Sequence, residues 1–401
     1  MNANIVRSGT SVSPRLTRTG TVLEPGAIRL GTRRSALATA QAGMMADHLR
    51  ELGHTVEMVE ITTIGDTSTA SLSSIGGTGV FAAAIRMALL AGEIDIAVHS
   101  LKDLPVAPEP GLVIAAIPVR EDARDALVAR DGLTLGELPN GSVVGTGSPR
   151  RMAQLAALGL GLSVKDIRGN VDTRISLVRD SSCDAVLLAR AGLARLGRLD
   201  EVTESLDPLQ MLPAPGQGAL AIECREDRPD LIAALKPLDD PDTRACVSAE
   251  RALLAALEAG CTAPVGALAV VVEGEHGTEL YLRAFAGSVD ADVELRRSSV
   301  GPLEAPERLG RELAAVLLED GAADIIVSGP SDLAETPDAD VGDPPPETSA
   351  PDASPATETL KSEALQSEAL QSETLQSEGR QPETLPFDAS RSDRPTSERA
   401  T

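Results

Sequence analysis

Aromatic side chains are almost absent from this 401-residue chain, which has no tryptophan, one tyrosine and three phenylalanines. Platforms that bind single-stranded nucleic acid stack the bases on aromatic rings, so this composition nearly excludes one. Positive charge is also scarce, because 36 basic side chains face 60 acidic ones and the formal net charge is -24. This excess of acid argues against general affinity for nucleic acid or for an anionic membrane, since both are negatively charged.

Long apolar runs are missing as well, and none approaches the roughly 18 residues of a membrane-spanning helix. The four cysteines, Cys183, Cys224, Cys246 and Cys261, lie far apart and form no CxxC pair. Their spacing predicts neither a zinc site nor a disulfide framework, and it fits a reducing compartment. We therefore expect no metal, a cytoplasmic location, and core positions for the first three cysteines, which fall within strand or helix patterns.

Both ends of the chain differ in composition from its middle. Residues 1–25 are rich in Ser, Thr and Arg, which is typical of a disordered start, although a transit peptide can have the same composition. Residues 331–401 hold 16 acidic and 5 basic residues, and leucine recurs there every five residues, a period of neither helix nor strand. We expect this acidic tail to be disordered and solvating, with binding of a partner as the alternative.

The middle of the chain alternates strand and helix patterns, such as the buried strand pattern at 94–100 and a further short strand pattern, KDIRG, at 165–169. This alternation favours α/β domains with largely parallel sheets. Farther along, a helix pattern at 243–258 precedes three strand patterns spaced as antiparallel hairpins, and a last helix pattern covers 306–319. This second arrangement predicts a small α+β domain.

Several arginine-bearing segments each follow a strand pattern, namely GTRRS (31–35), GTGSPRR (145–151), RGNVDTR (168–174) and Arg195 after DAVLLAR. Ser35, Ser148 and Asn170 are N-cap candidates, and a helix N-terminus favours an anion. Ligand crevices of open α/β sheets lie at the carboxyl ends of the strands. Forked guanidinium groups there suit a ligand with several carboxylates, or a phosphate, although no phosphate-loop motif is present. Solvated surface arginines are the alternative.

Arg150 and Arg151 lie in the first turn of their predicted helix, where positive charge opposes the helix dipole. An anionic ligand would relieve that repulsion. A general preference for arginine is the competing explanation, because only four of the 36 basic residues are lysines.

Two further segments carry reactive groups. VHSLKDLP at 98–105 runs from a buried strand pattern into Lys102 and Asp103, a pair that can place an acid/base carboxylate beside a charge that sets its pKa. A surface ion pair is the alternative. Cys261, in AGCTAPVG, follows a helix pattern and its glycine cap. It can be a nucleophile, a covalent attachment point or an unreactive thiol.

In this order the segments resemble one family, the porphobilinogen deaminases. The similarity runs from about Ala27 to Gly321 and is most specific in VHSLKDLP, GTGSPRRMAQL, RGNVDTR, LPAPGQGALAIECR and AGCTAPVG. The resemblance implies an enzyme of haem biosynthesis that condenses four porphobilinogen molecules head to tail into hydroxymethylbilane and releases ammonia. It implies a dipyrromethane cofactor held by a thioether to Cys261, no metal, and a monomer with no nucleic-acid or membrane partner.

The resemblance also implies a role for each charged segment. Asp103 matches the family's catalytic carboxylate, and Lys102 matches a cofactor ligand that helps to keep Asp103 ionised. The other cofactor-binding positions are Ser148, Arg150, Arg151, Gly169, Arg174 and Arg195. The substrate-binding positions are Arg33, Ser35 and Arg168. Each pyrrole ring carries an acetate and a propionate, so a growing chain needs many cations.

The family's layout predicts an α/β fold of three domains: two lobes similar to those of periplasmic binding proteins and a small α+β C-terminal domain with an antiparallel sheet. The expected boundaries are a disordered extension at 1–25, domain 1 at 26–118 with 216–239 returning to it, domain 2 at 119–215, domain 3 at 240–330 and the disordered acidic tail at 331–401.

Two departures from the family pattern and two other functions stay open. Residues 73–79 lack the basic residues usual in the family's mobile loop. Asp172 stands where the family often has glycine, and it can weaken the grip of Arg168 and Arg174 unless it points away. A non-catalytic two-lobed anion-binding protein is the second hypothesis, although it leaves Cys261 unexplained. An interaction protein that acts through the acidic tail is the third.

Overall fold

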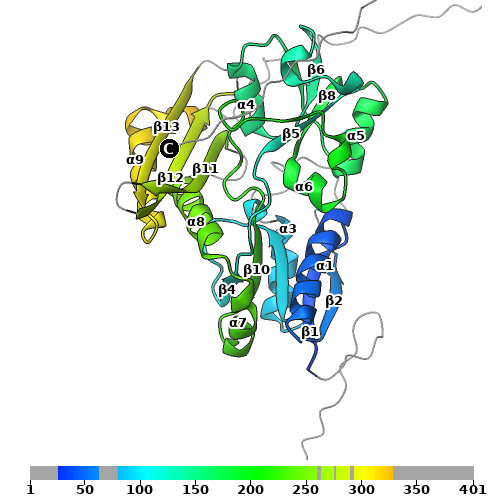
Figure 1. Ribbon diagram of the computed structural model, residues 1–401, viewed down its shortest axis with the longest axis vertical. Helices are drawn as coiled ribbons and strands as arrows, with labels where there is room; N and C mark the ends of the chain where they lie inside the picture. Colours follow the sequence, from blue (N-terminus) through cyan, green and yellow to red (C-terminus); the bar gives the residue numbers. More distant parts are fainter. Residues whose placement is uncertain (1–25, 63–79, 260–262, 275–276, 290–292, 328–401) are drawn as a thin grey trace, which may run out of the picture. The chain divides into compact units, whose positions relative to one another are not determined.

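The computed structural model describes residues 26–62, 80–259, 263–274, 277–289 and 293–327. These residues form three sheets with helices packed against them (Figure 1). The mixed α/β architecture with an additional antiparallel sheet confirms the expected fold class. The N-terminal extension, the loop at 73–79 and the acidic tail lie outside the described residues, so the predictions made for them stay predictions.

The first sheet has the strand order β2-β1-β3-β10-β4. Its strands are β1 (Ile28–Arg33), β2 (Val56–Ile61), β3 (Ile96–Ser100), β4 (Leu112–Ala116) and β10 (Leu220–Arg225), and its helices are α1 (Ala36–Glu51), α3 (Val80–Leu90) and α7 (Pro229–Leu235). Strand β10 returns from far along the chain to lie between β3 and β4 (Figure 1). Its register pairs Leu220 with Ser100, which brings the residues just before β10 beside those just after β3.

The second sheet has the order β7-β6-β8-β5-β9. Its strands are β5 (Asp125–Ala129), β6 (Val143–Gly145), β7 (Ser163–Lys165), β8 (Ala185–Ala189) and β9 (Glu204–Ser205), and its helices are α4 (Pro149–Ala157), α5 (Val171–Arg179) and α6 (Arg190–Arg195). The expected strand at 165–169 is wrong beyond Lys165. Residues 166–169 instead form the turn that leads into α5.

Both of these sheets are mixed, whereas the sequence predicted largely parallel ones. Strand β10 runs antiparallel to β3 and β4, and β5 runs antiparallel to β8 and β9. A parallel neighbour needs a crossover of a dozen or more residues, usually a helix. The chain instead enters β5 from the first sheet, through residues 117–124, and re-enters the first sheet at β10, through residues 206–219. Neither strand therefore follows a neighbour of its own sheet through a crossover helix. Strand periodicity carries no information on direction, so the sequence could not show this.

The third sheet is an antiparallel meander of β11 (Val265–Gly274), β12 (Gly277–Gly287) and β13 (Glu294–Pro302). Its helices are α8 (Pro241–Ala256), α9 (Pro306–Glu319) and α10 (Ala322–Val327). Leu253, Leu282 and Leu317 are fully buried in the core between helices and sheet. A Cβ atom on Gly310 would lie 2.2 Å from the carbonyl oxygen of Ala249, so the close contact of α8 and α9 needs glycine there.

Three of the cysteines are buried in the cores, as expected. Cys183, Cys224 and Cys246 are free thiols and are at most 7% exposed. Burial raises the pKa of Cys224 to about 11 and that of Cys246 to about 12, which keeps both protonated and unreactive at neutral pH. Within the described ranges, no helix is long and apolar enough to cross a membrane and no side chains cluster as metal ligands.

Candidate active site

A short 3₁₀ turn, Leu101–Asp103, follows β3 and presents the adjacent Lys102 and Asp103. Leu101 and Leu104 on either side are buried, which fixes the turn, while Lys102 is partly buried and Asp103 is exposed. Arg251 of α8 contacts the backbone that follows the turn. Its guanidinium donates to the carbonyl oxygen of Leu104 at 3.1 Å and to that of Pro105 at 2.7 Å.

A pocket of about 150 Å³ opens beside this turn. Its lining comes from the turn, the start of α4, the segment before β10, the end of α8 and the start of β11: Lys102, Asp103, Ser148, Arg150, Ala214, Pro215, Gln217, Leu254, Ala263 and Val265. Residues that the sequence placed in separate segments, Lys102, Asp103, Ser148 and Arg150, therefore share one cavity. Cys261 lies outside the described residues, but Ala263 and Val265, which follow it in sequence, reach the pocket.

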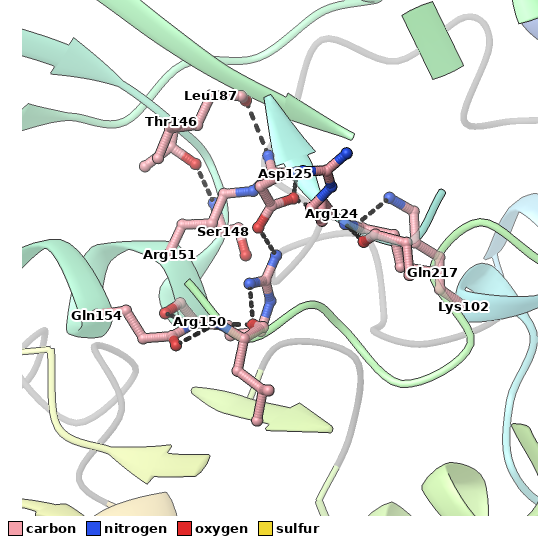
Figure 2. A network of polar contacts seen from close by, with 12 residues as sticks. Lys102, Arg124, Asp125, Thr146, Ser148, Arg150, Arg151, Gln154, Leu187 and Gln217 are labelled. Carbon is pink, nitrogen blue, oxygen red and sulfur yellow. Dashed lines mark hydrogen bonds and ion pairs between the residues drawn. The ribbon is translucent and has the colours of Figure 1, made fainter. Parts of the chain in front are cut away.

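Arg150 and Arg151 begin α4, with Ser148 at its N-cap and Pro149 in the first turn, as expected. Both guanidinium groups are almost fully buried. Each donates from Nη2 to the carboxylate of Asp125, at 2.8 Å in both cases (Figure 2). The sequence argument expected a ligand to relieve the positive charge in this turn. The chain itself supplies an anion here, because β5 of the same sheet begins with Asp125 beside α4.

Asp125 has no exposed surface, and burial alone would raise its pKa. The charges of Arg150 and Arg151 outweigh burial and hold the pKa of Asp125 well below its ordinary value. The group is therefore a permanent anion at any working pH. Two guanidinium groups share this single carboxylate, so the cluster keeps one unit of positive charge beside the pocket.

Gln217 connects this cluster to Lys102 (Figure 2). Its Nε2 donates to Asp125 Oδ1 at 2.8 Å and to the carbonyl oxygen of Ala123 at 2.7 Å, and its Oε1 accepts from Lys102 Nζ at 3.2 Å. Burial lowers the pKa of Lys102 to about 8; among its neighbours, the charge of Asp103 opposes this shift and that of Arg151 adds to it. Lys102 is thus a cation that begins to lose its proton just above neutral pH.

The RGN segment forms the cap of α5. Asn170 accepts from the backbone N–H of Thr173 at 2.9 Å, and Gly169 has the left-handed φ of +109° that glycine allows. The carbonyl oxygen of Gly169 accepts from Arg174 Nε at 2.9 Å. Burial lowers the pKa of Arg174 to about 10, and the charges of Arg151 and then Arg168 act in the same direction.

Three further residues beside the second sheet each have a partner within the chain. Arg168 is exposed and pairs with Asp166 at 3.0 Å. Asp172 pairs with Arg198, and its charge is not among the main influences on Arg174. Arg195 donates to the carbonyl oxygen of Gly218, next to Gln217.

Arg33 and Ser35 lie where β1 ends and α1 begins. Ser35 is the N-cap of α1 and accepts from the backbone N–H of Ala38 at 3.3 Å, as its position predicted. Neither residue is among the described residues that line the pocket.

Asp125 and Gln217 are the residues of this site that sequence reasoning missed. No local pattern gave Asp125 a role, and Gln217 was expected only as part of the segment 216–239 that returns to domain 1. A lone carboxylate heading an otherwise apolar strand, DALVA, and the glycines on both sides of Gln217 were the available signals. Their partners lie 25 to 115 residues away in sequence, which no local pattern reveals.

Comparison with known proteins gives a consistent result. Residues 28–233 match the family model "porphobilinogen deaminase, dipyromethane cofactor binding domain", and residues 244–319 match the porphobilinogen deaminase C-terminal domain. Porphobilinogen deaminase of Mycobacteroides abscessus is 58% identical over 304 residues, covering 75% of this chain and 99% of its own length. Porphobilinogen deaminase 1 of Streptomyces avermitilis is 59% identical, over 75% of this chain and 97% of its own.

Among solved structures, a nutrient-binding protein from Burkholderia cenocepacia aligns with 52% of this chain and 90% of its own, at 12% identity and a TM-score of 0.34. This likeness is too weak to add to the fold described above. The family matches cover all three sheets, which together line the pocket, and they do not favour a non-catalytic anion-binding protein. The chain belongs to the porphobilinogen deaminase family, the dipyrromethane-dependent enzymes of tetrapyrrole biosynthesis.

Proposed function

We propose that the pocket beside Lys102 and Asp103 is where this chain joins four porphobilinogen molecules head to tail into hydroxymethylbilane, the activity of a hydroxymethylbilane synthase. The observation that carries the proposal is the composition of the pocket. It combines an exposed carboxylate, Asp103, with the cations Lys102 and Arg150, and with Ala263, two residues beyond Cys261. Chemistry on a pyrrole with carboxylate side chains needs a group that transfers protons and cations that bind those carboxylates.

The residues present fit a carboxylate-bearing cofactor. Arg150 Nε and Arg151 Nε are buried without a hydrogen-bond partner among the described residues. Buried donors of this kind are rare because they cost free energy, and an acidic ligand that reaches them would remove that cost. The pair also keeps a net positive charge after its contact with Asp125. A dipyrromethane with acetate and propionate side chains meets both needs.

Residue roles follow from this fit as proposals. Cys261 attaches the cofactor covalently, and the residues that hold its carboxylates are Lys102, Ser148, Arg150, Arg151, Gly169, Arg174 and Arg195. Arg33, Ser35 and Arg168 bind the incoming porphobilinogen. When bound, the cofactor supplies the pyrrole carbon to which the first substrate unit is joined.

Asp103 handles protons and developing positive charge. Loss of ammonia from porphobilinogen leaves an electron-poor pyrrole, and the carboxylate of Asp103 can stabilise that charge at the pyrrole N–H. The same carboxylate can accept the proton that is lost when the new bond forms. Lys102 is adjacent to Asp103 in the same turn, where its ammonium can bind an acidic group of the ligand.

Asp103→Asn and Asp103→Glu test this role. The asparagine keeps the shape and removes the charge, whereas the glutamate keeps the charge and moves it by one methylene. We expect a loss of roughly a hundred- to a thousandfold in turnover for Asp103→Asn and a much smaller loss for Asp103→Glu. Ammonia release per molecule of cofactor-loaded protein is the measurement. Near-normal turnover of a loaded Asp103→Asn protein would assign the acid/base role to another group.

We also propose a cytoplasmic monomer built from the three domains with the boundaries predicted above. The free thiols of Cys183, Cys224 and Cys246 support a reducing compartment. Each of the three predicted domains contains one of the three sheets. Sedimentation equilibrium of the full chain tests the oligomeric state, with 41.5 kDa expected for a monomer.

A further inference from the structure

The carboxylate of Asp125 is the centre of the polar network beside the pocket (Figure 2). It accepts from Arg150 Nη2, Arg151 Nη2 and Gln217 Nε2, all at 2.8 Å, and has no exposed surface. The guanidinium groups are held from the other side by carbonyl oxygens, that of Leu212 for Arg150 and that of Leu187 for Arg151. Each guanidinium plane is therefore fixed at two points and keeps its Nε–H unused within the described structure.

The orientation of the Gln217 amide in this network is fixed by its partners. Its nitrogen faces two acceptors, Asp125 Oδ1 and the carbonyl oxygen of Ala123, while its oxygen faces the ammonium of Lys102. The reversed amide would set N–H against a cation and a carbonyl against two acceptors, which loses all three hydrogen bonds. Asp125 is thus linked to Lys102 through the side chain of Gln217, and its negative charge also attracts the ammonium group of Lys102.

A purely structural role does not explain this arrangement. A buried ion cluster is often no more stable than apolar side chains of the same volume, so burial of three charges by itself gives no stability argument. Three members of the network line the pocket: Lys102, Arg150 and Gln217. Gln217 links Lys102 to Asp125, which in turn pairs with Arg150. The charge of Asp125 favours the protonated form of both Lys102 and Arg150.

We propose that Asp125 is a positioning residue for the proposed reaction: it orients the Arg150 and Arg151 guanidinium groups toward an acidic ligand and keeps Lys102 protonated. This inference rests on the proposed function. Among the described residues, the charges that act most strongly on Lys102 are those of Asp103 in its own turn, Arg151 and Arg150 at the start of α4, and Asp125 at the start of β5. Of these, both carboxylates favour the protonated lysine and both arginines disfavour it.

The test is Asp125→Asn in the full-length protein, isolated as it is produced, with two measurements. The first is the fraction of molecules that carry the covalent cofactor, from intact mass. The second is the pH dependence of kcat/KM, whose alkaline limb we assign to Lys102 because its pKa is lowered by burial. Removal of the Asp125 charge removes an attraction for the lysine proton, so we expect the alkaline limb to move to lower pH by about one unit and the loaded fraction to fall at least twofold.

Two further variants keep the result decisive. Gln217→Leu removes the acceptor of Lys102 and leaves the Asp125–arginine pairs in place, so it should also move the alkaline limb to lower pH. This variant decides the matter if Asp125→Asn does not fold. Asp184→Asn is the matched control. Asp184 belongs to the same sheet region and pairs with Arg130 at 2.7 Å, but it is not part of the pocket lining. This variant should therefore keep the normal alkaline limb and the normal cofactor loading.

An unchanged limb with full loading in the folded Asp125→Asn protein overturns the proposal. So does an unchanged limb in Gln217→Leu when Asp125→Asn fails to fold, or an equal shift in Asp184→Asn. A wild-type protein without any adduct or turnover overturns the proposed function together with this inference. A loaded and active wild type with unaffected variants overturns the inference alone.

Discussion

At the scale of single residues, Lys102 is the cation of the pocket lining whose charge changes nearest to neutral pH. Its pKa is lowered to about 8 by burial, and its ammonium is a proposed ligand for a carboxylate. Above that pH the lysine becomes neutral and binds a carboxylate less tightly. A bound cofactor carboxylate raises this pKa, so we expect kcat/KM of the loaded enzyme to fall as the pH rises above about 8.

Lys102→Arg tests this assignment. Arginine stays protonated well beyond this range, so the variant should keep a flat profile to at least pH 9 even if its absolute rate is lower. Steady-state kinetics between pH 6 and 10 provide the comparison. The same alkaline limb in the wild type and in Lys102→Arg would exclude Lys102 as the titrating group.

The residues that the sequence could predict share one property. Lys102 and Asp103 are adjacent in sequence, and Ser35 and Asn170 act on backbone groups three residues away, so local patterns were enough. The roles of Asp125 and Gln217 depend on partners that only the folded chain brings together. Arg150 and Arg151 lie between these cases, since their place at the start of a helix was predicted and their internal counter-ion was not.

At the scale of elements, α8 fixes the turn that carries Asp103. Arg251 of this helix donates to the carbonyl oxygens of Leu104 and Pro105, and the same helix leads toward Cys261. A forked guanidinium can hold two carbonyl oxygens at once, which an ammonium on a flexible stem does less well. We infer that Arg251 fixes the position of the turn relative to α8.

Arg251→Lys should therefore lower kcat by roughly ten- to a hundredfold, because small misplacements of a catalytic group have effects of this size. KM should change much less. Arg244→Lys is the control on the same helix, since Arg244 contacts Asp239 and the carbonyl oxygen of Ala115 rather than the turn. Equal losses of kcat in both variants would show that α8 matters only for general stability.

Element boundaries followed closely from sequence, whereas strand direction did not. The helices expected at 243–258 and 306–319 are observed as Pro241–Ala256 and Pro306–Glu319, because apolar periodicity and N-terminal prolines mark them. The antiparallel entry of β5 and β10 depends on how the chain passes between sheets. That is a property of the whole fold rather than of any segment.

At the scale of the whole molecule, one buried carboxylate joins segments from all three sheet regions. Glu250 of α8 has no exposed surface and pairs with Arg120, which lies between β4 and β5, at 2.6 Å. It also accepts from the backbone N–H groups of Gly216, before β10, and Ala269, on β11. Loss of its charge leaves a buried guanidinium without its counter-ion.

Glu250→Gln should lower the thermal midpoint by roughly 10 °C, because breaking a buried pair costs about 3–5 kcal/mol. Glu60→Gln is the control, since the pair of Glu60 with Arg34 is exposed and such pairs contribute at most about 1 kcal/mol. Differential scanning calorimetry of both proteins gives the comparison. Similar midpoints for the two variants would mean that Glu250 does not tie the segments together.

The central claim is that the chain carries a covalent dipyrromethane on Cys261, and intact mass of the purified full-length protein tests it most directly. We expect the wild type to exceed the mass of its polypeptide by one dipyrromethane, and Cys261→Ser to show the polypeptide mass alone. Cys183→Ser, in which a buried core thiol is replaced, should keep the adduct. A wild type without the added mass, or an adduct that persists in Cys261→Ser, would contradict the account.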